Sequence, residues 1–314
     1  MSGVGQRKNR HSTPDTRHPV LITTALLRRW PLPQPLEDDD KEGRGRVTVV
    51  GGAPEMPGAV ILAATAALRA GVGKVRVCAG SSIAQLVAQA VPEARVISLP
   101  ETKTGAIALR AVAKIVEHAE GAQAMLIGPG MIDERAIARL LKSVLPRVGH
   151  ATLVLDAGAL AFLYQAPHGL HELDAPTIIT PHAGEMASIC GRDKEAILRE
   201  AALTVRKAAA ELRAVVALKG RETFIAAPVG STYCNRAGNV GLATAGSGDT
   251  LSGIIAGLAA RGAEALQAAV WGVHLHARAG DRLARRMGRL GFLARELLAE
   301  IPPLMSELDG RKKR

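Results

Sequence analysis

Aromatic side chains are scarce in this sequence of 314 residues: Phe, Trp and Tyr together make up 2% of it, although hydrophobic residues make up 47%. The core must therefore consist mainly of Ala, Val, Leu and Ile, which suits helices packed closely on a parallel sheet. The scarcity also argues against a protein that binds single-stranded nucleic acid, because such proteins stack bases on aromatic rings. The chain is long enough for one large core or two smaller ones.

Cysteine is also rare, with Cys78, Cys190 and Cys234 far apart and no Cys-x-x-Cys pair. This pattern indicates neither a disulfide framework nor a zinc site, and we expect the reducing cytoplasm as the compartment. The N-terminus carries charges in place of the apolar run of a secretory signal. No apolar run approaches the roughly 18 residues of a membrane-spanning helix, so we expect no membrane association.

Acidic residues are outnumbered, because 40 Lys and Arg against 29 Asp and Glu give a formal net charge of +11. The excess gathers near the C-terminus, in a basic tail at 311–314 and at Arg278, Arg282, Arg285, Arg286, Arg289 and Arg295. A solvated helix face would account for these arginines, and their field would also favour an anionic small-molecule substrate. Nucleic acid is a third interpretation, but no recognition motif accompanies the charge, so we expect no specific nucleic acid partner.

Three regions follow from the distribution of Pro, Gly and charge. Residues 1–45 read as a flexible charged N-terminal arm, 46–302 as one domain and 303–314 as a basic C-terminal tail. Within the domain, short β-branched runs alternate with longer Ala- and Leu-rich helical runs such as 58–70 and 105–119. We expect strands at 47–50, 74–79, 124–128, 152–156, 177–180 and 215–220. A hairpin follows the last of them, with its turn at 228–230. This alternation predicts an α/β fold with a mostly parallel, doubly wound sheet.

Each of five expected strands ends in residues of unusual chemistry. These are Gly51-Gly52, Gly128-Pro129-Gly130, Asp156, Pro181-His182 followed by Gly184-Glu185, and Lys219-Gly220. Each is ordinary alone, because glycine pairs and Gly-Pro-Gly are turns by default and a lone His is more often structural. In open α/β sheets, however, ligands bind outside the carboxyl ends of the strands. Five such features at one edge therefore predict a ligand site there.

The stretch TAGSGDTLSGIIAGLAARG, residues 244–262, begins a helix with glycines and one carboxylate. Gly246, Ser247 and Gly248 let backbone amides point at one anion, and the helix dipole adds about half a positive charge. Asp249 either caps the helix or acts as the general base for a hydroxyl that attacks phosphorus. The pair Gly253 and Gly257 predicts close helix packing. A Walker A loop and a GxGxxG dinucleotide motif are both absent.

The stretch TAGSGDTLSGIIAGL resembles the GSGD motif of the ribokinase-like superfamily. Other stretches, VVGGAPEMPGAVILAATAALRAGVGKVRV, IGPGM, LDAGAL, TPHAGEM, LKGRETFIA and NRAGNVGLATAGSGD, narrow the resemblance to the ADP-dependent (S)-NAD(P)H-hydrate dehydratase family. The similarity runs from Arg46 to Pro302. It implies a three-layer α/β/α sandwich and the repair of NADHX and NADPHX to NADH and NADPH, in which ADP is converted to AMP and phosphate.

The resemblance also implies roles for single residues. It assigns nucleotide binding to Lys219, Gly220, Arg221, Glu222, Thr223 and Gly248. It assigns substrate contacts to Ala63, Gly130, His182 and Asp249, with Asp249 as the catalytic residue. ADP or ATP would be the co-substrate and Mg²⁺ would assist, although the sequence does not assign the metal ligands. The chain departs from the family pattern at Arg236, Ala237 and Ala245, and Arg236 is a candidate phosphate contact.

Relatives of this family form tetramers, which implies a homotetramer here. Many carry a fused epimerase, for which 45 residues are too few, so we expect the epimerase to be a separate protein. Two other functions share these residues. A kinase of a small hydroxylated metabolite would use the same anion hole, although its superfamily relatives usually show DTTGAGD where this chain has ATAGSGD. A non-catalytic nucleotide-binding regulator would keep Lys219 and Gly248 without needing Asp249.

Overall fold

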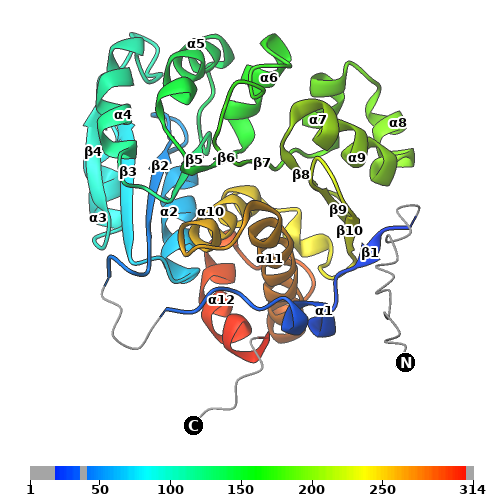
Figure 1. Cartoon of the computed structure of the whole chain (residues 1–314). Coiled ribbons are helices and arrows are strands. Elements are labelled where there is room, and N and C mark those ends of the chain that lie inside the picture. Colours follow the sequence, from blue (N-terminus) through cyan, green and yellow to red (C-terminus); the bar gives the residue numbers. More distant parts are fainter. Residues whose placement is uncertain (1–17, 36–40, 309–314) are drawn as a thin grey trace, which may run out of the picture.

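The protein is built around one ten-stranded sheet, as seen in the computed structural model, which describes residues 18–35 and 41–308 (Figure 1). The strand order is β1-β10-β9-β8-β7-β6-β5-β2-β3-β4. The strands are β1 Val20–Leu21, β2 Arg46–Val50, β3 Lys74–Gly80, β4 Arg95–Leu99, β5 Ala124–Ile127, β6 Thr152–Leu155, β7 Thr177–Ile179, β8 Val215–Leu218, β9 Thr223–Ala226 and β10 Thr232–Asn235. All neighbouring pairs are parallel except the two that β9 makes, with β8 and with β10. The predicted mostly parallel sheet and the β9–β10 hairpin are confirmed.

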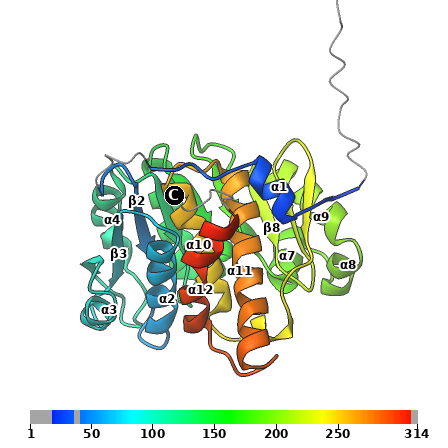
Figure 2. The ribbon, with the colours of Figure 1, turned by 90° about the horizontal axis from the view of Figure 1, so that it is seen from below.

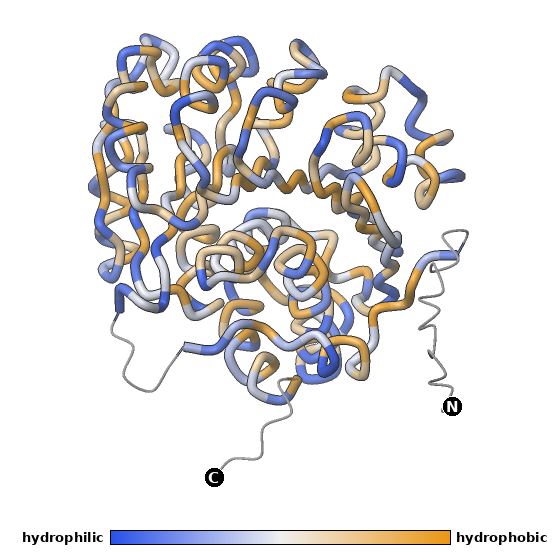
Figure 3. Tube along the Cα trace, viewed as in Figure 1, coloured by the Kyte–Doolittle hydropathy of each residue, from blue (hydrophilic) through white to orange (hydrophobic). Residues whose placement is uncertain are grey.

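Helices cover both faces of the sheet, which confirms the three-layer sandwich (Figures 1 and 2). One layer contains α1 Thr24–Arg29, α2 Pro57–Arg69, α3 Ala84–Ala90, α10 Ser247–Ala260, α11 Ala265–Met287 and α12 Ala294–Leu308. The other contains α4 Val112–Ala119, α5 Glu134–Val144, α6 Ala161–Gln165, α7 Ala183–Cys190, α8 Lys194–Arg199 and α9 Ala201–Leu212. Side chains alternate along each strand, so Val47 and Val49 of β2 join the first core while Val50 joins the second. Figure 3 shows the resulting band of hydrophobic strands between the two layers.

The scarcity of large side chains lets α10 and α2 approach each other closely. A Cβ atom added to Gly253 would lie 2.2 Å from the carbonyl oxygen of Ala63, and one added to Gly257 would lie 2.7 Å from that of Ala67. Neither position therefore accepts a side chain without moving the helices. The predicted close packing of this glycine pair is confirmed, and it fixes where α10 begins relative to the sheet.

The ends of the chain contribute more structure than the sequence predicts. Part of the expected arm, residues 18–35, forms β1 and α1, where β1 pairs with β10 and Leu27 is fully buried. Residues 1–17 of the arm lie outside the described residues. Helix α12 continues through Pro302 and Pro303 to Leu308, because Leu304 and Leu308 are buried in the core. Residues 309–314 of the expected basic tail also lie outside the described residues.

The arginine-rich face of α11 packs beside α12. Arg286 is paired with Glu300 at 2.6 Å between side-chain N and O, and Arg282 contacts both Glu300 and Glu307. Among the described residues, part of the basic excess is thus neutralised by acidic side chains of the neighbouring helix. This favours the interpretation of these arginines as a helix face over a nucleic acid surface.

Candidate functional site

The polar residues that follow the strands lie in a row along the carboxyl edge of the sheet. Because the sheet order is β8-β7-β6-β5-β2, the row begins with Lys219 and passes through His182, Asp156, Gly128 and Gly51. The backbones of β7 and β8 continue to pair beyond the strands themselves, since the Lys219 amide donates to the Pro181 carbonyl at 2.8 Å. The predicted gathering of these strand ends at one edge is confirmed.

A cavity of about 1110 Å³ opens at the β8 end of this row. It is lined by the five residues 219–223, by His182, Ser247, Gly248 and His276, and by the loop Asn235–Asn239. Arg236 lies on its wall, with Nε 2.8 Å from Oε1 of Glu222, so the two residues on either side of the hairpin's open end form an ion pair. The expected nucleotide-binding residues thus share one cavity with Ser247 and Gly248 of the expected anion hole, whereas Gly246 does not line it.

Helix α10 begins at the edge of this cavity. Gly246 precedes it with φ +83°, and a Cβ there would meet Leu62 at 2.4 Å, so glycine is required. The Ser247 amide already donates to the Thr244 carbonyl at 3.2 Å. Gly248 and Asp249 follow as the second and third helical residues, whose amides have no carbonyl partner within an α-helix. The amides of this helix end without a helical carbonyl partner are therefore those of Gly248 and Asp249, and the Asp249 amide donates to its own carboxylate.

Asp249 lies in the first turn of α10, and the capping position is occupied by Gly246. The alternative in which Asp249 is the N-cap of the helix is therefore wrong, because the helix starts three residues earlier than that role requires. Burial, reinforced by the nearby carboxylate of Asp156, raises the pKa of Asp249 to about 6, although Lys219 acts in the opposite direction. Such a carboxylate is ionised at neutral pH and still a stronger base than an ordinary aspartate, as a general base should be.

The Lys219 ammonium lies between acidic groups. Its Nζ is 3.0 Å from Oδ1 of Asp156 and 4.0 Å from Oε2 of Glu185. Burial lowers the pKa of Lys219, but the two carboxylates outweigh burial and raise the pKa above the ordinary lysine value. Lys219 therefore carries a permanent positive charge at the cavity wall.

His182 caps helix α7 and keeps one ring nitrogen free of that role. Its Nδ1 accepts the amides of Gly184 and Glu185 at 3.0 and 3.1 Å, while Glu185 Oε2 accepts the His182 amide at 2.6 Å. With Nδ1 accepting, the neutral ring carries its proton on Nε2, which lies 3.5 Å from Glu185 Oε1. The side chain is 60% exposed and lines the cavity, so His182 is both a structural cap and available to a ligand.

Three of the four expected substrate contacts do not line this cavity: Asp249, which adjoins the lining residue Gly248, and also Ala63 and Gly130. Ala63 is fully buried in the α2–α10 interface. Gly130 follows β5 with φ +71°, where a Cβ would meet the Met56 carbonyl oxygen at 2.6 Å, so it is packed on the start of α2. Neither residue belongs to the lining of the cavity described above. The structure thus brings Lys219, His182 and Gly248 together at one cavity, whereas Ala63 lies in the interface between α2 and α10.

Three residues of the site had no role assigned from the sequence. Asp156 and Glu185 follow the ends of strands, so the sequence marks both as candidates for the site. Their pairing with Lys219 depends on the order of the strands in the sheet and could not be predicted. His276 lies in the middle of α11, and its Nε2 shares a hydrogen bond with Ser247 Oγ at 3.0 Å. No local pattern distinguishes it from a core residue. Burial lowers the pKa of His276 to about 4, so it is neutral at neutral pH.

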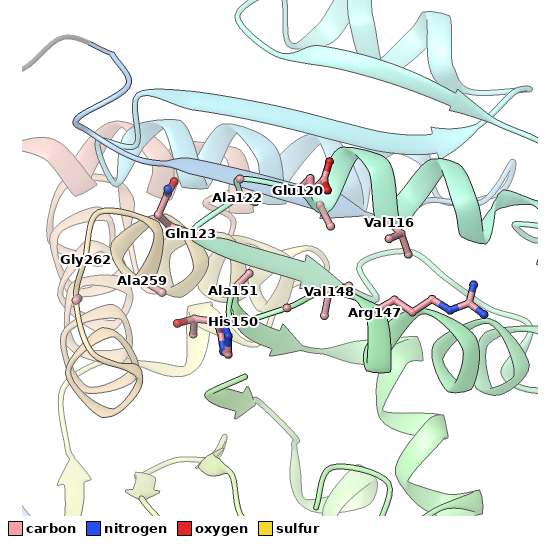
Figure 4. A pocket seen from close by; sticks show the side chains of 15 residues that line it. Val116, Glu120, Ala122, Gln123, Arg147, Val148, His150, Ala151, Ala259 and Gly262 are labelled. Carbon is pink, nitrogen blue, oxygen red and sulfur yellow. The ribbon is translucent and has the colours of Figure 1, made fainter. Parts of the chain in front are cut away.

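A second hollow, of about 640 Å³, lies at the opposite edge of the sheet, beside the amino ends of β5 and β6 (Figure 4). Its polar side chains do not converge, since Gln123 and Arg147 lie at opposite ends of it. Gln123 is also engaged already, because its Oε1 accepts the Arg46 amide at 2.7 Å. Ligand chemistry is therefore concentrated at the carboxyl edge.

Within residues 18–35 and 41–308, no three His, Cys, Asp or Glu side chains are grouped so that they could hold a metal ion by themselves. The same residues contain no helix that is both long and apolar enough to cross a membrane.

The family model described as NAD(P)H-hydrate dehydratase matches residues 47–303. The chain is 46% identical over 287 residues to the ADP-dependent (S)-NAD(P)H-hydrate dehydratase of Xanthomonas campestris pv. campestris, covering 91% of this chain and 96% of that protein. It is 40% identical to the bifunctional NAD(P)H-hydrate repair enzyme of Moorella thermoacetica, covering 92% of this chain and 54% of that enzyme. The structure of the ADP/ATP-dependent NAD(P)H-hydrate dehydratase of Bacillus subtilis, co-crystallised with ATP and Mg²⁺, matches with a TM-score of 0.80 at 28% identity, covering 93% of this chain and 99% of that one. The predicted family is confirmed: this chain belongs to the NAD(P)H-hydrate dehydratase family.

Proposed function

We propose that this protein converts the S-form of NADHX and NADPHX back to NADH and NADPH, with ADP as the phosphoryl donor and AMP and phosphate as the other products. The observation that carries the proposal is the meeting of three groups at the start of α10. These are the Asp249 carboxylate, the amide of Gly248, and the Lys219 ammonium beside it. A base, an anion site and a fixed positive charge are what phosphoryl transfer to a hydroxyl requires.

The first step is transfer of the terminal phosphoryl group of ADP to the ring hydroxyl of the hydrate. Asp249 takes the hydroxyl proton as the oxygen attacks phosphorus, and the bond between that phosphorus and the AMP oxygen breaks. The amide of Gly248 and the charge of Lys219 stabilise the transferring group, whose negative charge is spread over its equatorial oxygens.

The second step is elimination of phosphate. Hydroxide is a poor leaving group and phosphate is a good one, so phosphorylation makes this carbon–oxygen bond easy to break. The lone pair of the ring nitrogen expels phosphate, and loss of the neighbouring proton restores the double bond of the dihydropyridine. The net change removes one water from the hydrate and uses it to convert ADP to AMP and phosphate.

The residues 219–223 and Gly248 form the nucleotide site in this proposal, since all of them line the cavity. Arg236 adds a positive charge to the same wall. His182, exposed at the cavity, offers Nε2 to the hydrated substrate, and Gly130 lies farther along the strand-end row. We assign Ala63 a packing role, because its small size lets α10 approach α2.

Mg²⁺ fits this site as an ion held mainly by the phosphates of the nucleotide, because such ions usually bind only one or two protein carboxylates. Among the described residues no group of His, Cys, Asp or Glu side chains could hold the ion by itself, so the nucleotide phosphates and water would supply most of its ligands and Asp249 stays free as the base. When bound, the ion would neutralise part of the phosphate charge. The Bacillus subtilis relative, co-crystallised with ATP and Mg²⁺, supports the presence of this ion together with the nucleotide.

We also infer that the protein works in the cytoplasm as a homotetramer and receives its substrate from a separate epimerase. The Xanthomonas relative, of which the chain covers 96%, is named for the dehydratase alone, which supports the last point. Light scattering on the purified protein tests the oligomeric state, with a monomer as the contradicting result.

The direct test is incubation of the protein with NADHX, Mg²⁺ and either ADP or ATP. Return of the absorbance band of reduced nicotinamide reports the restored dihydropyridine, and we expect it with ADP. Accumulation of a phosphorylated hydrate without that band would identify a kinase instead. A protein that binds ADP but changes neither compound would be a regulator.

A further inference from the structure

Asp156 is a buried carboxylate to which the proposed reaction assigns no role. Its side chain is only 2% exposed. It precedes the short 3-10 helix Ala157–Leu160 but makes no side-chain capping bond to it. The next residue, Ala157, has φ +47°, a left-handed conformation that is strained for a residue other than glycine. Capping therefore does not explain this carboxylate, and strained backbone of this kind gathers at functional sites.

Two donors from the neighbouring strand ends hold the Asp156 carboxylate. Thr180 Oγ1 donates to its Oδ1 at 2.7 Å, and Lys219 Nζ donates to the same oxygen at 3.0 Å. The three residues follow β6, β7 and β8, which are adjacent in the sheet. A buried carboxylate without a partner would be strongly destabilising, so the position of Asp156 and the charge of Lys219 depend on each other.

The same ammonium reaches the start of α10. A Cβ atom added to Gly248 would lie 3.5 Å from Lys219 Nζ, so the ammonium lies directly beside that backbone. The lysine stem is flexible and loses roughly 2 kcal/mol of rotamer entropy when it is fixed. Bonding to Asp156 fixes it before any nucleotide binds, so the charge is already in place next to the amide that would receive a phosphate.

We propose that Asp156 is a positioning residue for the reaction: it holds the Lys219 ammonium against the transferring phosphoryl group and touches neither substrate itself. The proposal rests on the proposed function. It separates two tasks within one buried cluster, since Asp249 accepts the proton while Asp156 orients the charge that stabilises phosphorus.

Replacing Asp156 changes the pH dependence of turnover whatever its role, so kcat must be compared on the pH plateau, where Asp249 is ionised in both proteins. The charged groups that face Asp249 are Asp156 and Lys219, and Lys219 in turn faces Glu185 and affects His276. Replacing Asp156 by a neutral residue removes the like charge that faces Asp249. The pKa of Asp249 then falls, and the acidic limb of the rate profile moves to lower pH.

The central variant is Asp156→Asn, which keeps the size of the side chain and an oxygen for Thr180. We expect kcat to fall by about 10²-fold, the cost of a misplaced group in a catalytic site, with the KM for ADP within about 3-fold. The acidic limb should shift down by roughly 1 pH unit. Glu93→Gln is the matched control, because Glu93 is an exposed carboxylate remote from the cavity. It should change neither kcat, nor the KM for ADP, nor the position of the acidic limb. Unchanged kcat on the pH plateau, or a loss that appears only as a raised KM for ADP, would overturn the proposal.

If Asp156→Asn does not fold, Thr180→Val gives a second measurement. It removes one of the two donors to Asp156 and keeps the volume and the negative charge. We expect kcat to fall by roughly 10-fold, about the loss of one hydrogen bond, with the KM for ADP unchanged. Normal kcat in a folded Thr180→Val protein would count against the positioning role.

Measurements of ADP binding test the role of Asp156 independently of the proposed reaction, because they do not require turnover of NADHX. Calorimetry gives the Kd for ADP of the wild type, Asp156→Asn, Lys219→Met and the double variant, which together form a double-mutant cycle. We expect the effect of Asp156→Asn on this Kd to differ by at least 3-fold between proteins with and without Lys219. Additive effects would overturn the positioning role even if NADHX turns over. A wild type without NADHX turnover but with this coupling would overturn the reaction and leave the link between Asp156 and Lys219 intact.

Discussion

Ser247 Oγ and His276 Nε2 lie 3.0 Å apart, so the first residue of α10 is tied to the middle of α11. Both residues are buried, and both line the cavity. Since burial lowers the pKa of His276 to about 4, the ring is neutral and the bond is an ordinary one between a hydroxyl and an imidazole. This contact holds the helix end whose Gly248 amide forms the proposed anion site.

His276→Leu should weaken that anchor without adding or removing charge at neutral pH. Loss of one buried hydrogen bond predicts a decrease in the free energy of unfolding of about 1–2 kcal/mol. We expect turnover to fall by roughly 10-fold, because the Gly248 amide is no longer held as firmly. His276→Gln, which can still bond to Ser247, should restore part of both. Thermal melts and turnover on the same preparations measure this, and equal losses in the two variants would contradict it.

The activity of the wild type should decline below pH 6. Burial and the Asp156 carboxylate raise the pKa of Asp249 to about 6, and only the ionised form can accept the proton. The rate should therefore drop about tenfold for each pH unit below that value. His276 is not expected to contribute, since it titrates near pH 4. A rate profile from pH 4.5 to 8 that stays flat through pH 6 would exclude Asp249 as the titrating base.

Gly253→Ala should destabilise the protein more than its small size suggests. The new methyl group would lie 2.2 Å from the Ala63 carbonyl oxygen, so α2 and α10 must move apart. Overpacking of this kind typically costs about 1–3 kcal/mol. Gly58→Ala is the control, because nothing lies within 4 Å of a Cβ at that helical position, and it should stabilise by up to about 1 kcal/mol. Denaturant melts that rank the two variants the other way would refute the packing argument.

Most of the sheet could be predicted from the sequence, because buried parallel strands appear as short β-branched runs. Strand β4 was not predicted, since Arg95 and Ser98 interrupt its apolar pattern and are exposed at the sheet edge. Segment 18–35 was not predicted either, because its order depends on docking of residues such as Leu27 on distant helices. The site residues that follow strands could be found, whereas the pairing of Asp156 with Lys219 spans 63 positions and exists only in the folded sheet.

Asp249→Asn separates the catalytic role of this residue from its structural one. In the folded protein the pKa of Asp249 is raised, so the contribution of this group to stability is greatest below the ordinary carboxyl range and is lost as the pH rises through about 6. At pH 7.5 the charged form is thus unfavourable, and replacing it by neutral Asn should raise the free energy of unfolding by on the order of 1 kcal/mol. At pH 4 the two proteins should be nearly equal in stability.

Turnover should respond in the opposite sense. Without the base, the rate with NADHX should fall by about 10²-fold or more, while ADP still binds, and more tightly, because a negative charge facing the phosphates has been removed. Thermal melts with and without ADP at both pH values, and NADHX turnover on the same preparation, measure all three effects. A stable Asp249→Asn variant that binds ADP and turns over normally would rule Asp249 out as the base. The proton would then have to pass to a bound water, because His182 Nδ1 accepts two backbone amides and the neutral ring carries its proton on Nε2.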